Sequence, residues 1–599
     1  MQIWGDYYLF TSLKTLGIPG DSTTFQGGIF RSTDYGQSWT DISGDLPRYD
    51  AEDSLFYDYW KFDVHPTDPD MIVTATTRGS GFDEPGVYAT WDGGLAWDFL
   101  YMPAIGGWMD STWFWDPYAF DIQMAPSNPN RVVLALVDVE ISNDGGLNWN
   151  PAFTQPVGNG WKGNGLELMN TETVAFHPTN PDIFWVGYDD MGLFRTEDGG
   201  NSFIRLDPHM DPTIGALSGI DAVKDIQVDP VNGDLYISRY QGSQGGLLED
   251  FSAGGVVFSS DLGDTQMDIS GGLPAGRCDL VLDPQSGAPG SRTLYTAIFH
   301  HGVYKSTNSG ASWAAINSGL GNNAQYAWEI AVHPTNTQVL YLGLNSRGRG
   351  IPGLYKSTDG GQSWQSVSSF PAGDVLSLFV DSGDRVYASV TDNFDWNTDG
   401  GLYVSNDGGG TWQEILNHSR IVDITRHPSS PQVLLAAGQP WYKVGNDLGE
   451  LYLSSDGGQS WQVISDGIRH TFFNFARFHS LHPDSLYAGT AGGGLWFTAD
   501  AVVGIPDGQP IVRDFVLRQN YPNPFNPTTT IVYHIPRRSH VRLSIYDLLG
   551  REIMTLVNRE QVAGEYSVNL NAESLPGGIY LYRLEAGTFR QTRKMVLLK

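Results

Sequence analysis

Tryptophan and tyrosine residues gather in three segments of the chain, two of which also contain aspartate. The longest is GGWMDSTWFWDPY at 106–118, and NFDWN and QPWYK are shorter. An aromatic ring can stack on the C–H face of a sugar, and a nearby carboxylate can accept hydrogen bonds from its hydroxyls. These residue types therefore favour polysaccharide binding, although the same rings could instead pack between structural units. The candidate contacts are Trp108, Trp113, Trp115, Trp161, Trp396 and Trp441.

Patterns typical of other chemistries are missing from the sequence. It has no phosphate loop, dinucleotide-binding fingerprint, zinc-ligand spacing or EF-hand loop. His-Pro pairs recur, but each falls in a different structural unit, so the rings cannot meet around one metal ion. The sequence therefore predicts no cofactor and no metal site. The histidines that we interpret as turn residues are His65, His177, His333, His427 and His482.

The charge of the chain is unevenly distributed. The whole chain has 35 Lys and Arg against 67 Asp and Glu, a formal net charge of −32, but the segment from Asp507 to the end has 12 against 8. Such a break marks a domain boundary. The strongly acidic part before it repels nucleic acid and anionic lipid, so we expect neither as a partner. No apolar run of about 18 residues occurs, so we expect no transmembrane segment.

A short motif, as in STDGGQSW and SNDGGGTW, recurs nine times before this boundary. Glycine stands two positions after the anchor residue in all nine copies, and an aromatic residue stands five positions after it in eight; Gln266 is the exception. The anchor side chain can accept hydrogen bonds from its own turn, and the glycine allows a positive φ. The aromatic residue then covers the hairpin. The anchors are Asp34, Asp92, Asp144, Asp198, Asp261, Asn308, Asp359, Asp407 and Asp456.

The spacing of the motif predicts the architecture. Successive anchors are 47 to 63 residues apart, and the runs between them alternate strand-like segments with turns. Each unit therefore corresponds to about four short strands, which is one blade of a β-propeller. Residues 485–500 have the strands without the motif, which brings the count to ten. We expect an all-β fold with about ten blades.

These motifs resemble the Asp-box (BNR) repeat family, which includes sialidases, sortilin-type propellers and the xyloglucanases of glycoside hydrolase family 74 (GH74). The resemblance covers residues 1 to about 500 and implies the fold more strongly than the function. A sialidase would carry an Arg-x-Pro segment before its first box and an arginine triad. Because the sequence lacks the first and is poor in arginine here, we do not expect a sialidase.

Residues 161–200 resemble the second catalytic segment of the GH74 family. GLE near their start is similar to the family's GIE, and YDDMGLF places Asp190 at the position of a catalytic aspartate, although Met191 and Leu193 differ from the usual residues. The resemblance implies an inverting endo-glucanase that acts on xyloglucan and related β-glucans. It also implies two seven-bladed propellers, each of which supplies one catalytic aspartate.

The unit count fits this arrangement. Units four to ten would form a seven-bladed propeller at 161–503, and residues 1–160 would be the last three blades of another. The first residues, MQIWGDYYLF, lack the pattern of a signal peptide. We therefore expect that the protein continues upstream, where the partner carboxylate would lie. Whether the protein is an enzyme stays open at this point, because the alternative is a non-catalytic surface propeller that binds glycan or protein.

Residues 511–599 follow a linker at 504–510 and form a separate β-rich domain. The segments QNYPNPFNPTTTIVYHIP, LSIYDLLGREIMTLV and RKMVLLK resemble the C-terminal sorting domain of type IX secretion cargo. That resemblance implies an immunoglobulin-like sandwich, recognition by the type IX machinery, and a secreted or outer-membrane cell-surface location. The alternative is an ordinary immunoglobulin-like accessory module.

The chain has one cysteine, Cys278, so it can form no intramolecular disulfide. It stands in the strand-like run CDLVLD. We predict a small buried apolar residue there.

Overall fold

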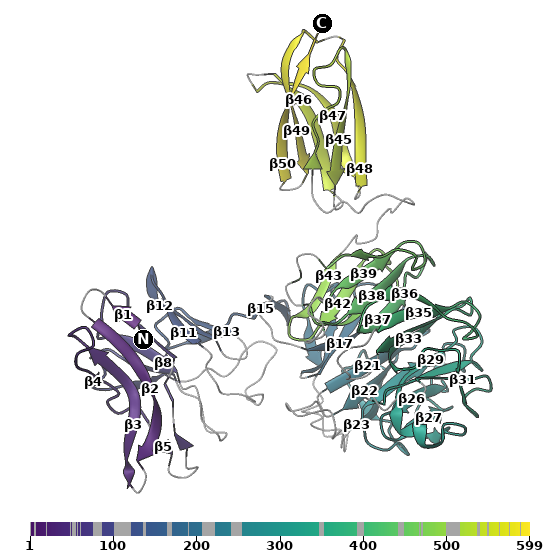
Figure 1. Ribbon diagram of the computed structural model, residues 1–599, viewed down its shortest axis with the longest axis horizontal. Coiled ribbons are helices and arrows are strands. Elements are labelled where there is room, and N and C mark those ends of the chain that lie inside the picture. The colour runs from purple at the N-terminus through teal and green to yellow at the C-terminus, as the bar shows by residue number, and fades with distance from the viewer. Residues whose placement is uncertain are drawn as a thin grey trace.

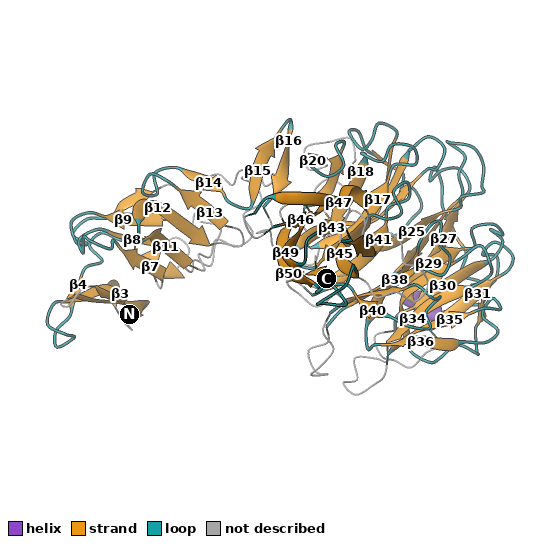
Figure 2. Ribbon diagram, turned by 90° about the horizontal axis from the view of Figure 1, so that it is seen from above, coloured by secondary structure: helices purple, strands orange, loops and turns teal. Residues whose placement is uncertain are grey.

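The protein is described by a computed structural model that is almost entirely β-structure (Figures 1 and 2). The described residues are 2–4, 8–18, 21–47, 49–50, 55–56, 58–59, 61–75, 87–100, 121–135, 139–164, 170–189, 191–206, 222–240, 254–346, 353–391, 400–440, 449–465, 468, 471–498, 516–535, 539–547, 550–561, 564–573, 575–586 and 589–598.

Three four-stranded antiparallel sheets come first along the chain, and the first strands of the second and third sheets contact each other. Their strands are β1 (Gln2–Trp4), β2 (Tyr8–Ile18), β3 (Asp21–Ser32) and β4 (Thr40–Asp41); β7 (Lys61–Val64), β8 (Ile72–Ala75), β9 (Val87–Thr90) and β10 (Asp98–Leu100); β11 (Asp121–Ala125), β12 (Asn128–Ala135), β13 (Val139–Ser142) and β14 (Trp149–Pro151). Two hairpins accompany them, β5 (Tyr49–Asp50) with β6 (Leu55–Phe56) and β15 (Thr154–Val157) with β16 (Gly160–Gly163).

Seven further antiparallel sheets follow, which we call ring sheets one to seven. The first four contain β17 (Thr171–Phe176), β18 (Phe184–Tyr188), β19 (Gly192–Thr196) and β20 (Ile204–Leu206); β21 (Ala222–Val228), β22 (Leu235–Tyr240), β23 (Gly254–Ser259) and β24 (Met267–Asp268); β25 (Cys278–Leu282), β26 (Leu294–Ile298), β27 (Gly302–Ser306) and β28 (Ala314–Ala315); β29 (Ala327–Val332), β30 (Leu340–Leu344), β31 (Leu354–Ser357) and β32 (Gln365–Ser366). A short 3₁₀ helix, η3 (Gly321–Tyr326), precedes β29.

The last three ring sheets contain β33 (Asp374–Val380), β34 (Val386–Thr391), β35 (Gly401–Ser405) and β36 (Gln413–Asn417); β37 (Ile421–Arg426), β38 (Leu434–Gly438), β39 (Leu451–Ser454) and β40 (Gln462–Val463); β41 (Phe473–Phe478), β42 (Leu486–Thr490) and β43 (Gly494–Thr498). Within the described residues the seventh sheet has three strands, and β43 is its outer strand.

The seven ring sheets form a closed circle. The first strand of each sheet contacts the first strand of the next, and β41 of the last sheet contacts β17 of the first. An isolated bridge joins Asn170 to Ala491 across this junction. The Asn474 amide strengthens the junction, because it donates to Asn170 Oδ1 at 2.6 Å and to the Thr171 carbonyl at 3.0 Å.

The recurring motif forms the turn between the third and fourth strands of a sheet. In the copy at Asp359, Oδ1 accepts the backbone N–H of Ser363 at 2.9 Å and Oδ2 accepts its hydroxyl at 2.6 Å. Ser357, two residues before the anchor, donates to Asp359 Oδ1 and accepts the N–H of Gly361. Gly361 has φ +88°, and a Cβ there would lie 2.5 Å from a side-chain carbon of the preceding sheet. The turn therefore needs both the acceptor and the glycine.

The aromatic residue of the motif joins neighbouring sheets rather than covering only its own hairpin. The Trp364 indole N–H donates to the Ile316 carbonyl of the preceding sheet at 2.7 Å, and Trp461 does the same to Ile415 at 2.6 Å. Gln266, which replaces the aromatic residue once, accepts two hydrogen bonds from the buried guanidinium of Arg239. This copy therefore has a polar interior contact where the other eight have an aromatic ring.

The His-Pro histidines lie in turns between the first and second strands, as the sequence indicates. In His177, His333 and His427, Nδ1 accepts backbone N–H groups that lie two or three residues later. His482 also lies in such a turn, between β41 and β42. In this turn, however, the histidine that accepts the backbone N–H groups is His479, whose Nδ1 accepts those of Leu481 and His482.

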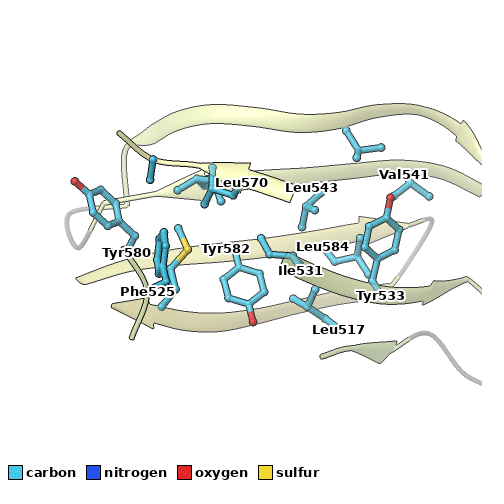
Figure 3. Packing of buried hydrophobic residues seen from close by; sticks show 14 of the residues in the cluster. Leu517, Phe525, Ile531, Tyr533, Val541, Leu543, Leu570, Tyr580, Tyr582 and Leu584 are labelled. Carbon is cyan, nitrogen blue, oxygen red and sulfur yellow. The ribbon is translucent and has the colours of Figure 1, made fainter. Parts of the chain in front are cut away.

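The C-terminal domain is a sandwich of two antiparallel sheets. One has the strand order β44 (Val516–Leu517), β45 (Thr528–Ile535), β48 (Gly564–Asn571), and the other β47 (Glu552–Gln561), β46 (Ser539–Tyr546), β49 (Gly578–Ala586), β50 (Phe589–Leu597). Figure 3 shows apolar side chains from both sheets meeting between them, including Tyr582 and Ile531.

The segment YPNPFNP is held along the last strand of this domain. Phe525 donates its N–H to the Val596 carbonyl at 2.9 Å and accepts the N–H of Leu598 at 2.8 Å, while Asn523 Oδ1 accepts the N–H of Val596. The opening and closing segments of the domain are therefore bound to each other.

Two predictions about the fold are confirmed. The chain is an all-β protein built from four-stranded sheets with a terminal sandwich, and Cys278 is buried in β25, where burial raises the pKa of its thiol to about 12. The domain boundaries at 160, 503 and 510 stay predictions.

Candidate functional site

One end of the ring is defined by the direction of its strands. The first strand of each ring sheet begins there, the second ends there and the third begins there, as the pairings Thr171↔Tyr188 and Tyr188↔Gly192 show in the first ring sheet. We call this end the mouth. Segments that connect second to third strands therefore start and finish at the mouth.

Three predicted site residues belong to such connecting segments. Asp190 stands between β18 and β19, Trp396 between β34 and β35, and Trp441 between β38 and β39. All three lie outside the described residues. The strands on either side nevertheless place the ends of all three segments at the mouth.

The other predicted contacts lie elsewhere. Trp108, Trp113 and Trp115 belong to the connection between β10 and β11 and are outside the described residues. Trp161 is half-buried in β16 and exchanges two backbone hydrogen bonds with Phe203, which precedes β20 at the end of the sheet opposite the mouth. Trp161 packs there against an apolar cluster of the first and last ring sheets.

A cavity of about 460 Å³ lies at the centre of the ring and is lined by the first strands of all seven sheets. In six of these strands the pairing register shifts near the strand's start, which is a β-bulge. A bulge redirects the extra side chain. Residues at all six bulges line the cavity: Glu172, Lys224, Trp328, Leu376, Val422 and Asn474.

A series of polar side chains connects neighbouring sheets at the mouth. Arg420 donates to Gln439 at 2.8 Å, Gln439 to Asn474 at 2.9 Å and Asn474 to Asn170 at 2.6 Å. Asn170 donates in turn to Asp189 Oδ2 at 3.2 Å. We call these five residues the amide chain. Because each amide is both donor and acceptor, the chain fixes the orientation of every member.

Asp189 anchors the connection that contains Asp190. Its other carboxylate oxygen accepts the Tyr240 hydroxyl, and its N–H donates to the Asn170 carbonyl at 2.9 Å. On the far side of Asp190, Met191 and Leu193 are buried in the core. These two departures from the family pattern are therefore packing residues, and both ends of the Asp190 connection are held firmly.

Among the charged residues that line the cavity, carboxyl groups outnumber basic groups. Burial raises the pKa of Asp225 and Glu329, and that of Asp279 well above its usual value, where the charge of Glu329 adds to the effect. Burial lowers the pKa of Arg477, which pairs with Asp423. A raised pKa means that a carboxyl holds its proton at a higher pH than usual.

Two of these carboxylates also join neighbouring sheets. Asp279 Oδ2 accepts the N–H of Ile330 at 2.8 Å, and Asp423 Oδ2 accepts the N–H of Ala476 at 2.9 Å. The same contact occurs in the N-terminal sheets, where Asp63 Oδ2 accepts the N–H of Met124 at 2.8 Å. An aspartate at this position of the first strand thus stabilises the packing of one sheet on the next.

Chemically, the cavity combines groups that bind hydroxylated molecules. Carboxyl groups, arginines, amides and an indole face one space, and protonated and ionised carboxyls together could supply an acid and a base. Among the described residues, no group of three or more His, Cys, Asp or Glu side chains is placed to hold a metal ion.

Sequence reasoning missed the cavity residues. A signal was present, because charged residues interrupt otherwise apolar first strands in KDIQV, CDLVL and WEIAV. Each of these three strands is followed by a turn that contains a His-Pro or Asp-Pro pair. Asp225, Asp279 and Glu329 each stand four residues before the His or Asp of that pair. Such a repeat of charge at one strand position could have identified the lining of a channel.

Comparison with family models identifies two segments of the chain. Residues 352–488 match the model described as Sortilin, neurotensin receptor 3, and residues 519–598 match the secretion system C-terminal sorting domain. The first covers the fifth and sixth ring sheets with their boxes, β31 and β32 of the fourth with its box, and β41 with the start of β42 of the seventh. The second covers the sandwich from β45 to β50.

Curated relatives include two xyloglucanases. A xyloglucanase of Paenibacillus sp is 26% identical over 229 residues, and one of Acetivibrio thermocellus is 24% identical over 231 residues. Each match covers 33% of this chain, and 21% and 26% of the respective relative. The chain thus spans about a fifth to a quarter of the length of the relatives it matches.

Solved structures with a similar fold include the GH74 enzyme of Niastella koreensis, with TM-score 0.38 and 15% identity over 82% of each chain. YCF48 bound to D1 peptide is similar with TM-score 0.36 and 17% identity, over 58% of this chain and 99% of that one.

The described residues contain no helix long and apolar enough to cross a membrane. The sorting domain indicates a secreted or cell-surface protein that is handled by export machinery. The chain thus combines Asp-box β-propeller sheets with a C-terminal sorting domain of type IX secretion.

Proposed function

We propose that this protein is an exported hydrolase of GH74 type that cleaves β-glucan chains such as xyloglucan, with Asp190 as one of two catalytic carboxyls. The observation that carries the proposal is the position of the Asp190 connection. It leaves and re-enters the ring at the mouth, beside Asp189, which lines the cavity and is fixed by Tyr240 and Asn170. The partial similarity to two xyloglucanases supports the choice of substrate.

An inverting glycosidase needs two carboxyl groups on opposite sides of the scissile bond. One protonates the leaving oxygen while the other removes a proton from the attacking water, and the two stand roughly 6.5–9.5 Å apart. We assign one of these roles to Asp190 and the other to a carboxyl of a second propeller. In this arrangement Trp396 and Trp441 stack on sugar rings that extend from the mouth.

The test is release of reducing sugar from xyloglucan and mixed-linkage β-glucan. The protein, extended by any upstream residues that its gene encodes, is compared with its Asp190→Asn and Asp359→Asn variants. Loss of the acid or base lowers the rate by about 10²–10⁴-fold, so Asp190→Asn should be nearly inactive. Asp359 lies in a box turn, and its variant controls for the loss of an aspartate.

A second candidate is a non-catalytic surface propeller that binds glycan or protein. It is favoured by the structural use of Asp279 and Asp423, whose carboxylates already accept backbone N–H groups of neighbouring sheets. Glycan binding without release of reducing sugar would reject the hydrolase and leave this candidate. Equal hydrolysis by the protein and by Asp190→Asn would reject the assignment of Asp190.

A further inference from the structure

Arg277 is a basic side chain at the mouth whose hydrogen-bond donors are unused. It directly precedes β25, and its guanidinium lies 4.4 Å from the centre of the Trp328 ring and 5.9 Å from that of Tyr240. It forms no hydrogen bond and no ion pair with another described residue, although it lines the cavity. Contact with two aromatic faces therefore orients the guanidinium while leaving its five N–H groups available.

Glu329 is an acceptor in the same cavity and is equally unused. It is the neighbour of Trp328 in β29, and among the described residues it has no hydrogen-bond or ion-pair partner. Its pKa is raised by burial and lowered by the charges of Lys224 and Arg277. Arg277 is thus near enough to act electrostatically on Glu329 and too far to pair with it. A donor and an acceptor thus line one cavity, and neither has a hydrogen-bond partner among the described residues.

The surroundings hold this space open. Trp328 packs edge-on against Phe299, with ring centres 5.6 Å apart, and the Asp189 carboxylate holds the Tyr240 hydroxyl. A site whose groups are fixed before binding loses little entropy when a ligand enters. The volume of about 460 Å³ falls within the range of small-molecule pockets.

The mixed charge of the lining indicates the class of ligand. Both carboxyls and basic groups line the cavity, so a ligand of either charge would meet groups of its own sign. A neutral molecule with adjacent hydroxyls can instead accept a hydrogen bond from an arginine and donate one to a carboxylate. This is the chemistry of a sugar ring with two neighbouring hydroxyl groups.

We propose that the mouth, between Arg277 and Glu329, is a subsite for one neutral sugar unit. Arg277 donates to one sugar oxygen, and Glu329 accepts from the neighbouring hydroxyl. The choice of a neutral glucan rests on the proposed function, but binding here requires no hydrolysis and does not involve Asp190. The subsite thus holds the end of a glucan chain at the mouth of the ring.

The test is calorimetric titration of the full chain with xyloglucan oligosaccharides and with cellotetraose. Arg277→Gln and Glu329→Gln should each weaken binding by at least about tenfold, because each removes a hydrogen bond to a charged group. The matched control is Arg583→Gln, which changes an arginine of the sandwich. Thermal unfolding establishes that the variants are folded, and Glu329→Gln serves alone if Arg277→Gln does not fold.

The outcomes separate this inference from the proposed hydrolase. In one outcome the parent protein binds the sugars, both variants bind them more weakly, and no hydrolysis is detected. This result supports the subsite and rejects the hydrolase. If hydrolysis occurs but both variants keep the affinity and KM of the parent protein, the subsite is wrong and the hydrolase stands. Absence of binding, or preferential binding of glucuronic acid or glucosamine over the neutral sugars, also overturns the subsite.

Discussion

At the scale of single residues, the box anchors act as local hydrogen-bond acceptors. Asp34, Asp359 and Asp407 have their pKa lowered to about 2, chiefly by hydrogen bonds from the serine or threonine four residues later. Asn308 makes the same turn without a charge: its Oδ1 accepts the N–H of Ser312 at 3.0 Å, and its amide donates to the Ser312 hydroxyl at 2.9 Å. The turn therefore needs an acceptor with this geometry rather than an ionised group.

We predict that Asp359→Asn is tolerated and Asp359→Ala is not. The folded-state pKa of about 2 lies below the usual value of 3.8, so the stability from this group is present above about pH 4 and is lost as the pH falls toward 2. Asparagine keeps the turn and removes this pH dependence, whereas alanine leaves the Ser363 N–H without its acceptor. Thermal unfolding between pH 7 and 2.5 measures both effects.

In these scans Asp359→Ala should lower the unfolding midpoint at pH 7 by a few degrees. Asp359→Asn should stay close to the parent protein at pH 7 and lose less of its midpoint on acidification. A midpoint for the asparagine variant as low as that of the alanine variant would show that the charge itself is required.

At the scale of elements, the junction between the seventh and first ring sheets depends on side chains as well as strand contacts. Asn474 of β41 connects the amide chain to Asn170 and Thr171. His479 contacts the Pro181 carbonyl across the same junction at 3.1 Å. These polar contacts supplement the apolar cluster that packs the first ring sheet against the seventh.

We predict that Asn474→Ala loosens the ring at this junction. The variant removes the hydrogen-bond partner of the Asn170 side-chain oxygen and of the Gln439 side-chain nitrogen, which costs about 1–3 kcal/mol. Hydrogen exchange should quicken in β17 and β41 before it changes in β29, which lies across the ring. Asn201→Ala, at an exposed box turn, is the control. Uniform quickening in all seven sheets would contradict a local role for Asn474.

The sequence was sufficient to predict elements that are formed by residues close together along the chain, such as the box turns. A box turn is made by residues within a few positions of its anchor, so the spacing of Asp, Gly and Trp sufficed. The interior of the channel could not be predicted in the same way, because its residues meet only when seven separate strands are arranged in a circle. The spacing also did not show that His479, rather than His482, accepts the backbone N–H groups in the turn of the seventh sheet. The pair of Arg239 and Gln266 has no signature along the chain.

At the scale of the whole molecule, the acidic propeller sheets and the near-neutral sorting domain have separate roles. The excess of acidic residues lies before Asp507. Like charge on the propeller sheets favours solubility outside the cell. The sandwich has its own closed core, which includes Tyr582 and Met595, and YPNPFNP is bound to β50 within it. The sorting domain thus has a core of its own.

The outer position of β43 also determines how the molecule bears tension. If the sorting domain is held at a surface and the ring grips a polymer, the load enters the ring at Thr498, the last residue of β43. β43 pairs with β42 alone among the described strands, so a pull on its end breaks the backbone hydrogen bonds one after another. We predict that optical-tweezer extension through the C-terminus opens the seventh sheet first, at low force; simultaneous rupture of the whole ring would contradict this. Under tension, β43 would then detach from β42 before the mouth of the ring is distorted.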